Sequence, residues 1–210
     1  MNPHEVTRAF ERELCRYTGA PHAVALDNCT SAIFLALMRE GIEGKTISIP
    51  ARTYMSVPCA IIQAGGRVNF LPVAGETITG KYWLEPTRVI DSALRFTAGM
   101  YVPGSHMCLS FTGPYKHLKL GKGGAILTDD AEADAWFRRA RFSGRREMSY
   151  HDDTFDMLGW NFWMLPQVAA LGLHLMPQFW HEGAPRQNED LTLPYPDLSR
   201  FAIYQGGQSQ

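Results

Sequence analysis

The chain has 210 residues, 45% of them hydrophobic and 20% charged, and this composition predicts a globular protein with one main core. A formal net charge of −1 gives no broad positive field, and no basic stretch is interleaved with aromatic residues, so nucleic acid is excluded as an expected partner. No run of 18 apolar residues occurs, which predicts that the chain has no membrane segment.

Helical and strand patterns alternate along the first 73 residues. An apolar stripe at i, i+4, i+8 and i+11 from Val6 predicts a helix that ends at Gly19. The next expected elements are a strand at 22–26, a capped and buried helix over 27–41, a strand at 45–50, a helix over 53–66 and a strand at 67–73.

Short apolar strands continue through the middle of the chain. They are expected at 87–91, 106–111 and 123–129, with helices over 130–142 and 165–176. This alternation is typical of βαβ crossovers, so the sequence predicts an α/β fold in three layers, with a mainly parallel sheet and helices on both of its faces.

The chain is expected to form one domain followed by a tail. Residues 1–181 make up the domain. Residues 182–210 are rich in Pro, Gly, Asn and Gln without a sustained period, so we expect an irregular tail that is wrapped on the surface, wrapped on a partner or partly disordered.

The cysteines are widely spaced and form no CxxC pair; they are Cys15, Cys29, Cys59 and Cys108. Their mostly apolar surroundings favour buried free thiols over a disulfide framework. We therefore expect a reducing compartment, the cytoplasm.

Two hydroxyl residues stand where a strand passes into a helix. In an open α/β sheet, ligands bind at the carboxyl ends of the strands. Thr30 and Ser31 begin a helix directly after a strand, and they offer hydroxyls, backbone N–H groups and the positive end of the helix dipole to a phosphate. The same residues also suit a plain helix cap, and that alternative stays open.

Asp91 ends an apolar strand. A carboxylate at such a position is costly to bury unless a positive partner or several hydrogen-bond donors meet it. An aspartate that caps the following turn is the competing interpretation.

Lys116 lies in the glycine-punctuated stretch SFTGPYKHLKLGKGG, residues 110–124. A lysine in an enclosed site near other positive charges loses proton affinity and becomes a nucleophile toward aldehydes. Loop lysines are more often solvated charges, as we expect for Lys119 and Lys122. The stretch is not a nucleotide P-loop, because GKGG lacks the Ser or Thr that should follow Gly-Lys.

Asn161 stands between aromatic residues in GWNFWM. Its amide either binds a ligand or forms a turn or cap within an aromatic core cluster.

The four candidate places are more informative together than each is alone. A phosphate cradle, a strand-end carboxylate and an aldehyde-reactive lysine match the requirements of pyridoxal 5′-phosphate.

These stretches resemble motifs of the DegT/DnrJ/EryC1/StrS family of sugar aminotransferases, in the fold type I class of pyridoxal-phosphate enzymes. Residues 10–37 resemble the opening of the family, and the later motifs are PARTYMSVPCAIIQAGG, VIDSA, SFTGPYKHLKLGKGGAILTDD and GWNFWM. The match runs in order over roughly residues 7–176. It implies the large domain of that class.

The resemblance implies a phosphate site made by two subunits. Thr30, Ser31 and Ser110 correspond to phosphate ligands within the chain. Asn161 corresponds to an asparagine that reaches the cofactor phosphate of the neighbouring subunit. A homodimer with a shared active site is the implied assembly.

The resemblance also implies the residues around the cofactor ring. Tyr54 would stack on the ring, Asp91 would pair with the pyridine nitrogen, and Lys116 would be the Schiff-base amine. The implied reaction transfers an amino group from a small-molecule donor to a keto sugar attached to a nucleotide.

The chain departs from the family pattern at several places. Cys29 replaces a glycine, Leu94 replaces a His or Gln, and Trp163 replaces an arginine that contacts substrate. About one βαβ unit is missing before Asp91, and so is the C-terminal small domain, so the resemblance is to a truncated member.

These departures keep two other functions open. One is a catalytically impaired remnant of the cofactor domain that acts as a binding or scaffold protein. The other is a sugar dehydratase, because family members with histidine at the lysine position act as dehydratases and His117 adjoins Lys116.

Overall fold

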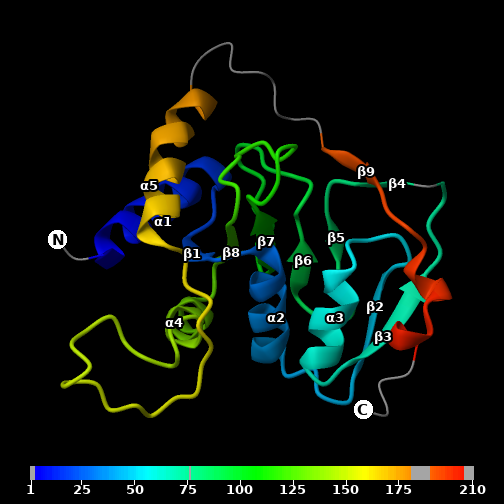
Figure 1. Ribbon diagram of the computed structural model, residues 1–210, viewed down its shortest axis with the longest axis horizontal. Helices are drawn as coiled ribbons and strands as arrows, with labels where there is room; N and C mark the ends of the chain where they lie inside the picture. Colours follow the sequence, from blue (N-terminus) through cyan, green and yellow to red (C-terminus); the bar gives the residue numbers. More distant parts are fainter. Residues whose placement is uncertain (1–2, 76, 181–189, 206–210) are drawn as a thin grey trace.

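Helices cover both faces of a central sheet in the computed structural model, which describes residues 3–75, 77–180 and 190–205 (Figure 1). The helices are α1 (Pro3–Thr18), α2 (Cys29–Glu40), α3 (Ser56–Gln63), α4 (Ala131–Ala140) and α5 (Pro166–Leu175), with 3-10 turns η1 (Met176–Phe179), η2 (Leu198–Arg200) and η3 (Ala202–Tyr204). The strands are β1 (His22–Leu26), β2 (Thr46–Pro50), β3 (Arg67–Leu71), β4 (Thr77–Thr79), β5 (Tyr82–Trp83), β6 (Val89–Asp91), β7 (His106–Ser110), β8 (Gly124–Thr128) and β9 (Thr192–Pro194).

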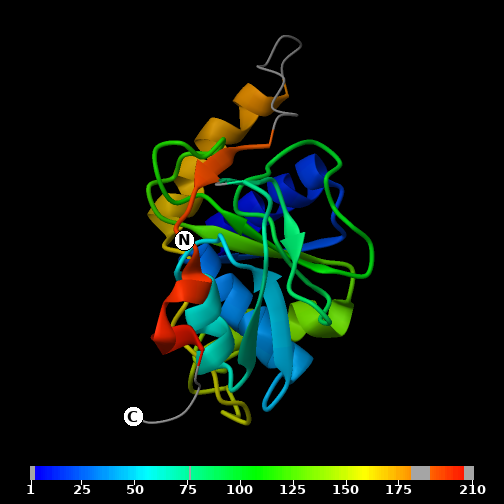
Figure 2. The same ribbon diagram turned by 90° about the vertical axis from the view of Figure 1, so that its right-hand side faces the viewer.

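Side chains alternate between two apolar layers along the central strands. In β1, Val24 and Leu26 join the cluster that packs α2, α3 and α4, whereas Ala23 and Ala25 join the cluster that packs α1 and α5. Figure 2 shows α1 (dark blue) and α5 (orange) above the sheet and the other three helices below it. The expected three-layer α/β architecture is therefore confirmed.

The sheet is mixed: β1, β6 and β7 run in one direction, whereas β5 and β8 run in the other and separate the expected parallel neighbours. The strand order is β1-β8-β7-β6-β5, with a separate β2-β3 pair. Only β6–β7 and β2–β3 run parallel; the pairs β1–β8, β7–β8, β5–β6 and β4–β9 are antiparallel among the described strands. Residues 111–123 join β7 to β8 without a helix, so the chain turns straight back instead of crossing over.

A backbone bridge connects the five-stranded sheet to the β2-β3 pair. Ser48 in β2 and Glu85 exchange both of their N–H···O bonds, at 2.8 and 3.1 Å. The short strand β5 and this bridge therefore fill the space between β6 and β2. The sequence pattern predicts neither β4 nor β5.

Local signals set the bounds of α2, the helix that carries the phosphate candidates. The Asn28 side chain accepts a hydrogen bond from the Ser31 N–H at 2.8 Å, and Gly41 ends the helix with φ of 60°. Between these ends the sequence is almost wholly apolar, because α2 packs against α3, α4 and the sheet.

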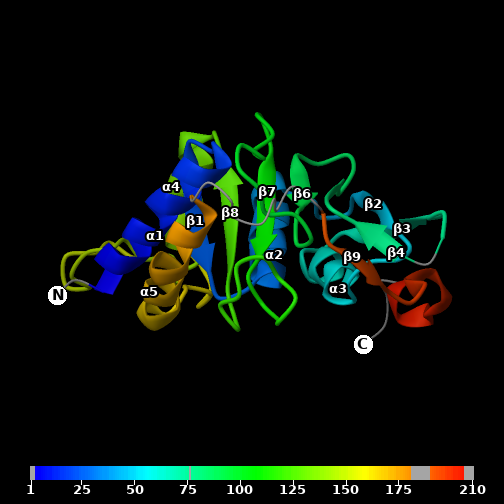
Figure 3. The ribbon, with the colours of Figure 1, turned by 90° about the horizontal axis from the view of Figure 1, so that it is seen from above.

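The chain after α5 returns to the opposite end of the molecule (Figure 3). We call residues 190–205 the C-terminal strap. It pairs with β4 through β9 and continues as η2 and η3 beside α3. Residues 182–189 and 206–210 of the expected irregular tail lie outside the described residues.

All four cysteines are free thiols, as expected; Cys29 and Cys108 are buried, and the other two are partly buried. Among the described residues, no helix is long and apolar enough to cross a bilayer.

Candidate active site

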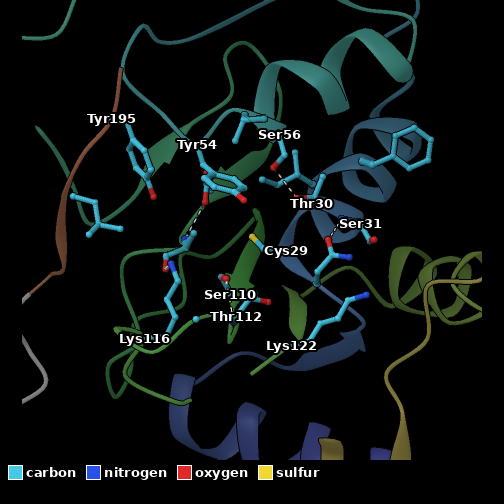
Figure 4. Close-up of a pocket in the computed structure, with 18 of the residues that line it drawn as sticks. Cys29, Thr30, Ser31, Tyr54, Ser56, Ser110, Thr112, Lys116, Lys122 and Tyr195 are labelled. Carbon is cyan, nitrogen blue, oxygen red and sulfur yellow. Dashed lines mark hydrogen bonds between the residues drawn. The ribbon is translucent and has the colours of Figure 1, made fainter. Parts of the chain in front are cut away.

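A pocket of about 960 Å³ opens where the start of α2, the loops after β2, β6 and β7, and the C-terminal strap meet (Figure 4). The predicted site residues that line it are Thr30, Ser31, Tyr54, Asp91, Ser110 and Lys116. Asn161 does not line it. The structure thus brings together residues that are up to 86 positions apart in the sequence.

Lys116 is a buried amine. Its side chain is 7% exposed, and its Nζ donates a hydrogen bond to the Ala93 carbonyl at 2.5 Å. Burial lowers the pKa of the amine, and the nearby Cys29 and Asp91 oppose that shift. No carboxylate forms an ion pair with Lys116 among the described residues. The amine therefore keeps hydrogen-bonding capacity for a ligand.

Asp91 is a buried carboxylate that neutral donors hold in place. Its Oδ2 accepts from the Tyr82 hydroxyl at 2.7 Å, and its Oδ1 accepts from the Ala93 N–H at 2.9 Å. Burial raises the pKa of Asp91, although these bonds and the Lys116 charge favour the ionised form. A positively charged group bound beside Asp91 would offset the cost of burying the carboxylate.

The Tyr82 hydroxyl lies within a short chain of hydrogen bonds. It contacts the Thr53 hydroxyl at 2.5 Å, and burial, with the Asp91 charge, raises the pKa of Tyr82 well above its ordinary value. Tyr82 therefore stays neutral and keeps donating to Asp91. Sequence reasoning missed this residue because β5 carries no recognisable strand pattern.

The start of α2 forms the side of the pocket suited to an anion. The first N–H groups of a helix have no acceptor within it, and the helix dipole places partial positive charge there. Thr30 and Ser31 occupy this first turn, and the Thr30 hydroxyl contacts the Ser56 hydroxyl of α3 at 2.7 Å. The Ser31 N–H is already bonded to Asn28, so the N–H groups before it are the ones left for a ligand.

Gly124 of β8 allows this first turn to sit directly on the sheet. A Cβ at position 124 would lie 2.4 Å from the Asn28 carbonyl carbon and 2.6 Å from the Cys29 nitrogen. Only glycine permits such a close approach between two backbones. Gly124, the second glycine of the pair in GKGGAILTD, therefore positions the candidate phosphate cradle.

The remaining predicted residues occupy three places. Ser110, at the end of β7, accepts from the Thr112 N–H at 3.4 Å and faces the pocket floor. Tyr54 lies at the mouth with 49% of its surface exposed. Asn161 is exposed outside the pocket, in a backbone bridge with Phe142.

Three other positions that the resemblance singles out lie away from the pocket. His117, Leu94 and Trp163 do not line it. Lys116 faces the pocket instead of its neighbour His117, which disfavours a dehydratase built on His117.

Two groups of lining residues were not predicted. Leu193, Pro194 and Tyr195 come from the C-terminal strap, whose sequence has no helix or strand period. The rigid Pro-Tyr-Pro run was the one signal that could have marked it as ordered. Phe34, Trp160 and Phe162 form an aromatic wall, in which the Trp160 and Phe162 rings stack 6.4 Å apart.

The donor set fits pyridoxal 5′-phosphate. The buried Asp91 carboxylate, without a contacting cation, suits a protonated ring nitrogen. Helix N–H groups and hydroxyls suit a dianionic phosphate, and the buried Lys116 amine suits an aldehyde. No cluster of metal-ligating side chains occurs in the parts of the chain that the structure describes.

A family model described as the DegT/DnrJ/EryC1/StrS aminotransferase family matches residues 2–83 and 102–193. The match therefore includes every predicted site residue except Asp91, which falls in the unmatched segment.

Known proteins match the chain over most of its length. A UDP-4-amino-4,6-dideoxy-N-acetyl-beta-L-altrosamine transaminase from Campylobacter jejuni is 24% identical over 221 residues, covering 85% of this chain and 58% of that protein. Helicobacter pylori PseC, an aminotransferase involved in the biosynthesis of pseudoaminic acid, superposes with a TM-score of 0.65 at 17% identity, covering 83% of this chain and 58% of PseC. The structure of 3-amino-5-hydroxybenzoic acid synthase superposes with a TM-score of 0.67 at 21% identity, covering 83% of this chain and 56% of that one. The chain thus spans less than two thirds of the length of these relatives.

Proposed function

Because the chain belongs to the DegT/DnrJ/EryC1/StrS aminotransferase family, we propose that it is a pyridoxal-phosphate-dependent aminotransferase that transfers an amino group to a keto sugar carried by a nucleotide. One observation carries this proposal. A buried amine, a buried carboxylate and the start of a helix, from three separate parts of the sequence, line a single pocket.

Each wall of the pocket has its own part in holding the cofactor. The α2 N-terminus, with Thr30 and Ser31, holds the phosphate, and Ser110 supports it from the end of β7. Asp91 would keep a proton on the ring nitrogen, Tyr54 would cover the ring, and the Lys116 amine would be the group that bonds the cofactor aldehyde. The bound cofactor supplies an electron sink that stabilises the negative charge developing on the donor carbon.

Lys116 also moves a proton. With its amine unprotonated, Lys116 would accept the proton from the donor carbon at its Nζ and hold it for the later return. The lowered pKa of Lys116 supports this role, because a larger fraction of the amine is unprotonated at neutral pH. Lys116 is 7% exposed, which limits the contact of its amine with bulk water.

The substrates we propose are a small amino donor and a nucleotide-linked keto sugar. The Campylobacter relative is named for a UDP-linked sugar, which supports the class and leaves the individual sugar open. The pocket volume of about 960 Å³ leaves space beyond a bound cofactor for part of such a substrate.

We further propose that the protein works as a homodimer in the cytoplasm. Asn161 is exposed outside the pocket of its own chain, as a residue that reaches into a partner's site must be. Exposed apolar side chains occur in the same loop region, including Phe155 and Leu158, and a second copy would cover them. Four free thiols support a reducing compartment.

The visible absorption spectrum after addition of pyridoxal phosphate tests the proposal. We expect wild type and Lys119→Ala to become yellow and, after borohydride reduction, to retain a covalent adduct on Lys116 by peptide mass. We expect Lys116→Ala to show neither. Lys119 is a matched control because it is an exposed lysine three residues away that does not line the pocket.

The activity itself needs a second assay. Transfer of nitrogen from a labelled amino donor to a keto sugar nucleotide is expected for wild type and lost in Lys116→Ala. An adduct without any transfer would favour the scaffold alternative, and no adduct in wild type would reject the cofactor assignment.

A further inference from the structure

Tyr195 is one of three residues of the C-terminal strap that line the pocket; the others are Leu193 and Pro194. Its ring centroid lies 6.1 Å from that of Tyr54, at an interplanar angle of 64°. In the view of Figure 4, its hydroxyl points into the pocket on the same side as Lys116, whereas Thr30 and Ser31 lie on the opposite side. Tyr195 therefore flanks the reactive end of the site and not the phosphate end.

The hydroxyl of Tyr195 is available to a ligand. It makes no hydrogen bond with any residue in the described ranges 3–75, 77–180 and 190–205. Burial, with the Asp91 charge nearby, raises the pKa of Tyr195 to about 12, so the phenol is neutral and can both donate and accept. Half-buried tyrosine hydroxyls usually find a partner.

Contacts to the backbone hold the segment around Tyr195 in place before any ligand arrives. Arg52 Nη1 donates to the Tyr195 carbonyl at 2.8 Å, and the Leu198 N–H donates to the Ala51 carbonyl at 2.8 Å. Pro194 and Pro196 flank Tyr195 and restrict its backbone to extended conformations. Because this backbone is already ordered, binding a ligand at Tyr195 costs no loop-ordering entropy.

The other end of the strap is equally anchored. Asp190 pairs with Arg95 at 3.1 Å, the Leu191 N–H donates to the Leu94 carbonyl at 2.8 Å, and β9 pairs with β4. Because both ends of the strap are bonded to the rest of the chain, the strap forms a fixed wall of the pocket.

We propose that Tyr195 is a specificity-determining residue that hydrogen-bonds the hydroxylated sugar ring of the substrate. The inference rests on the proposed function, since it assumes a sugar bound next to Lys116. A phenol that both donates and accepts suits a sugar hydroxyl, and the crossed Tyr54 and Tyr195 rings present apolar surface to the C–H faces of the ring. In this arrangement the strap recognises the sugar through Tyr195, and the start of α2 binds the cofactor phosphate.

Binding measurements on Tyr195→Phe test this assignment. The probes are UDP-glucose, dTDP-glucose and GDP-mannose, each compared with UDP, dTDP or GDP alone, by calorimetry on the cofactor-loaded protein. For the nucleotide sugar that wild type binds most tightly, we expect about a tenfold loss of affinity, the effect of one lost hydrogen bond. The matching nucleoside diphosphate should bind within about twofold of wild type, because it lacks the sugar.

Tyr204→Phe is the matched control on the same strap. The Tyr204 ring packs on Phe70 outside the pocket, so its variant should bind every probe as wild type does. The cofactor spectrum of each variant shows whether the loaded site is intact.

Three results would overturn the inference while the proposed function stands. They are an unchanged affinity in Tyr195→Phe, an equal loss for the nucleotide sugar and its nucleoside diphosphate, and a wild type that forms the cofactor adduct but binds none of the sugars. A wild type without a cofactor adduct would instead reject the proposed function.

Discussion

Asp91 and Lys116 are bound to the two polar groups of one residue: the Ala93 N–H donates to Asp91 Oδ1 at 2.9 Å, and the Ala93 carbonyl accepts from Lys116 Nζ at 2.5 Å. The acid and the amine are thus fixed relative to each other without an ion pair between them. Asp91 and Lys116 therefore both remain able to bind a ligand placed between them. Burying each of these ionisable groups destabilises the ligand-free protein. The first prediction follows from that destabilisation.

Asp91→Asn is expected to stabilise the cofactor-free protein and to weaken cofactor binding. The pKa of Asp91 is raised in the folded state, so the folded chain binds its proton more tightly than the unfolded chain does. The stability of wild type therefore falls as pH rises from the ordinary aspartate range through the raised pKa.

The advantage of Asp91→Asn should be near zero in acid and grow to roughly 1–3 kcal/mol above that window. Urea unfolding across a pH series measures it. Pyridoxal phosphate affinity should fall at least about tenfold, because a charge-assisted hydrogen bond is lost. A variant that is less stable at every pH would contradict this account of Asp91.

Glu11→Gln is expected to act in the opposite direction. Burial opposes the ionisation of Glu11, but ion pairs with Arg138 at 2.6 Å and Arg141 at 2.5 Å outweigh it and lower its pKa. Replacing the carboxylate removes the buried partner that the two arginines share. Arg138 keeps Asp134 at 2.9 Å and Arg141 keeps Glu147 at 3.2 Å, so the cost should be about 3 kcal/mol at neutral pH.

The cost of Glu11→Gln should shrink in acid. A lowered folded pKa gives stability that is present above the unfolded value and is lost as pH falls through the folded one. Urea midpoints at several pH values check this. Glu13→Gln, which removes a more exposed pair with Arg16 at 2.9 Å, should change stability by about 0.5 kcal/mol or less.

Gly124→Ala is expected to destabilise the fold by about 3 kcal/mol, because its Cβ would lie 2.4 Å from the Asn28 backbone. Gly66→Ala is the matched control. Its Cβ would meet the flexible end of Ile42 at 2.7 Å, so relief by side-chain movement should hold the cost to about 1 kcal/mol. Equal denaturation midpoints for the two variants would show that α2 is free to move away from the sheet.

Thr30→Val is expected to weaken pyridoxal phosphate binding about tenfold with little change in stability. Valine keeps the shape of threonine but removes the hydroxyl that contacts Ser56 and faces the anion site. Titration of the cofactor absorbance measures the affinity. Thr30→Ser, which restores a hydroxyl, should recover most of it, and a tight-binding Thr30→Val would remove Thr30 from the cradle.

Local sequence signals were enough where neighbours in the chain decide the structure. The Asn28 cap, the apolar run after it and Gly41 mark α2 without outside help. The strand-end position of Asp91 placed it at the pocket. Ser110, which only the resemblance singled out, lies there too, because the carboxyl ends of parallel β6 and β7 meet at the pocket.

Pairings between distant segments were beyond the same reasoning. β5 has only two residues, which pair with β6. Its surroundings come from distant segments, since Tyr82 contacts Thr53 and the following Glu85 contacts Ser48, and no local pattern encodes these contacts. The mixed sheet was missed for a related reason: apolar strands of five residues read alike whichever way they run. The strap sequence has no helix or strand period, so it did not predict an ordered segment. Contacts with Arg52, Arg95 and β4, which are distant in the sequence, hold the strap in place.

Three consecutive residues serve three different parts of the site. Arg52 holds the strap, Thr53 supports Tyr82 behind Asp91, and Tyr54 forms the pocket mouth. Each of them can be exchanged singly with a graded loss, but inserting or deleting one residue would shift all three at once. The loop after β2 is therefore constrained in length more strictly than in composition, and any working homologue should keep its residue count.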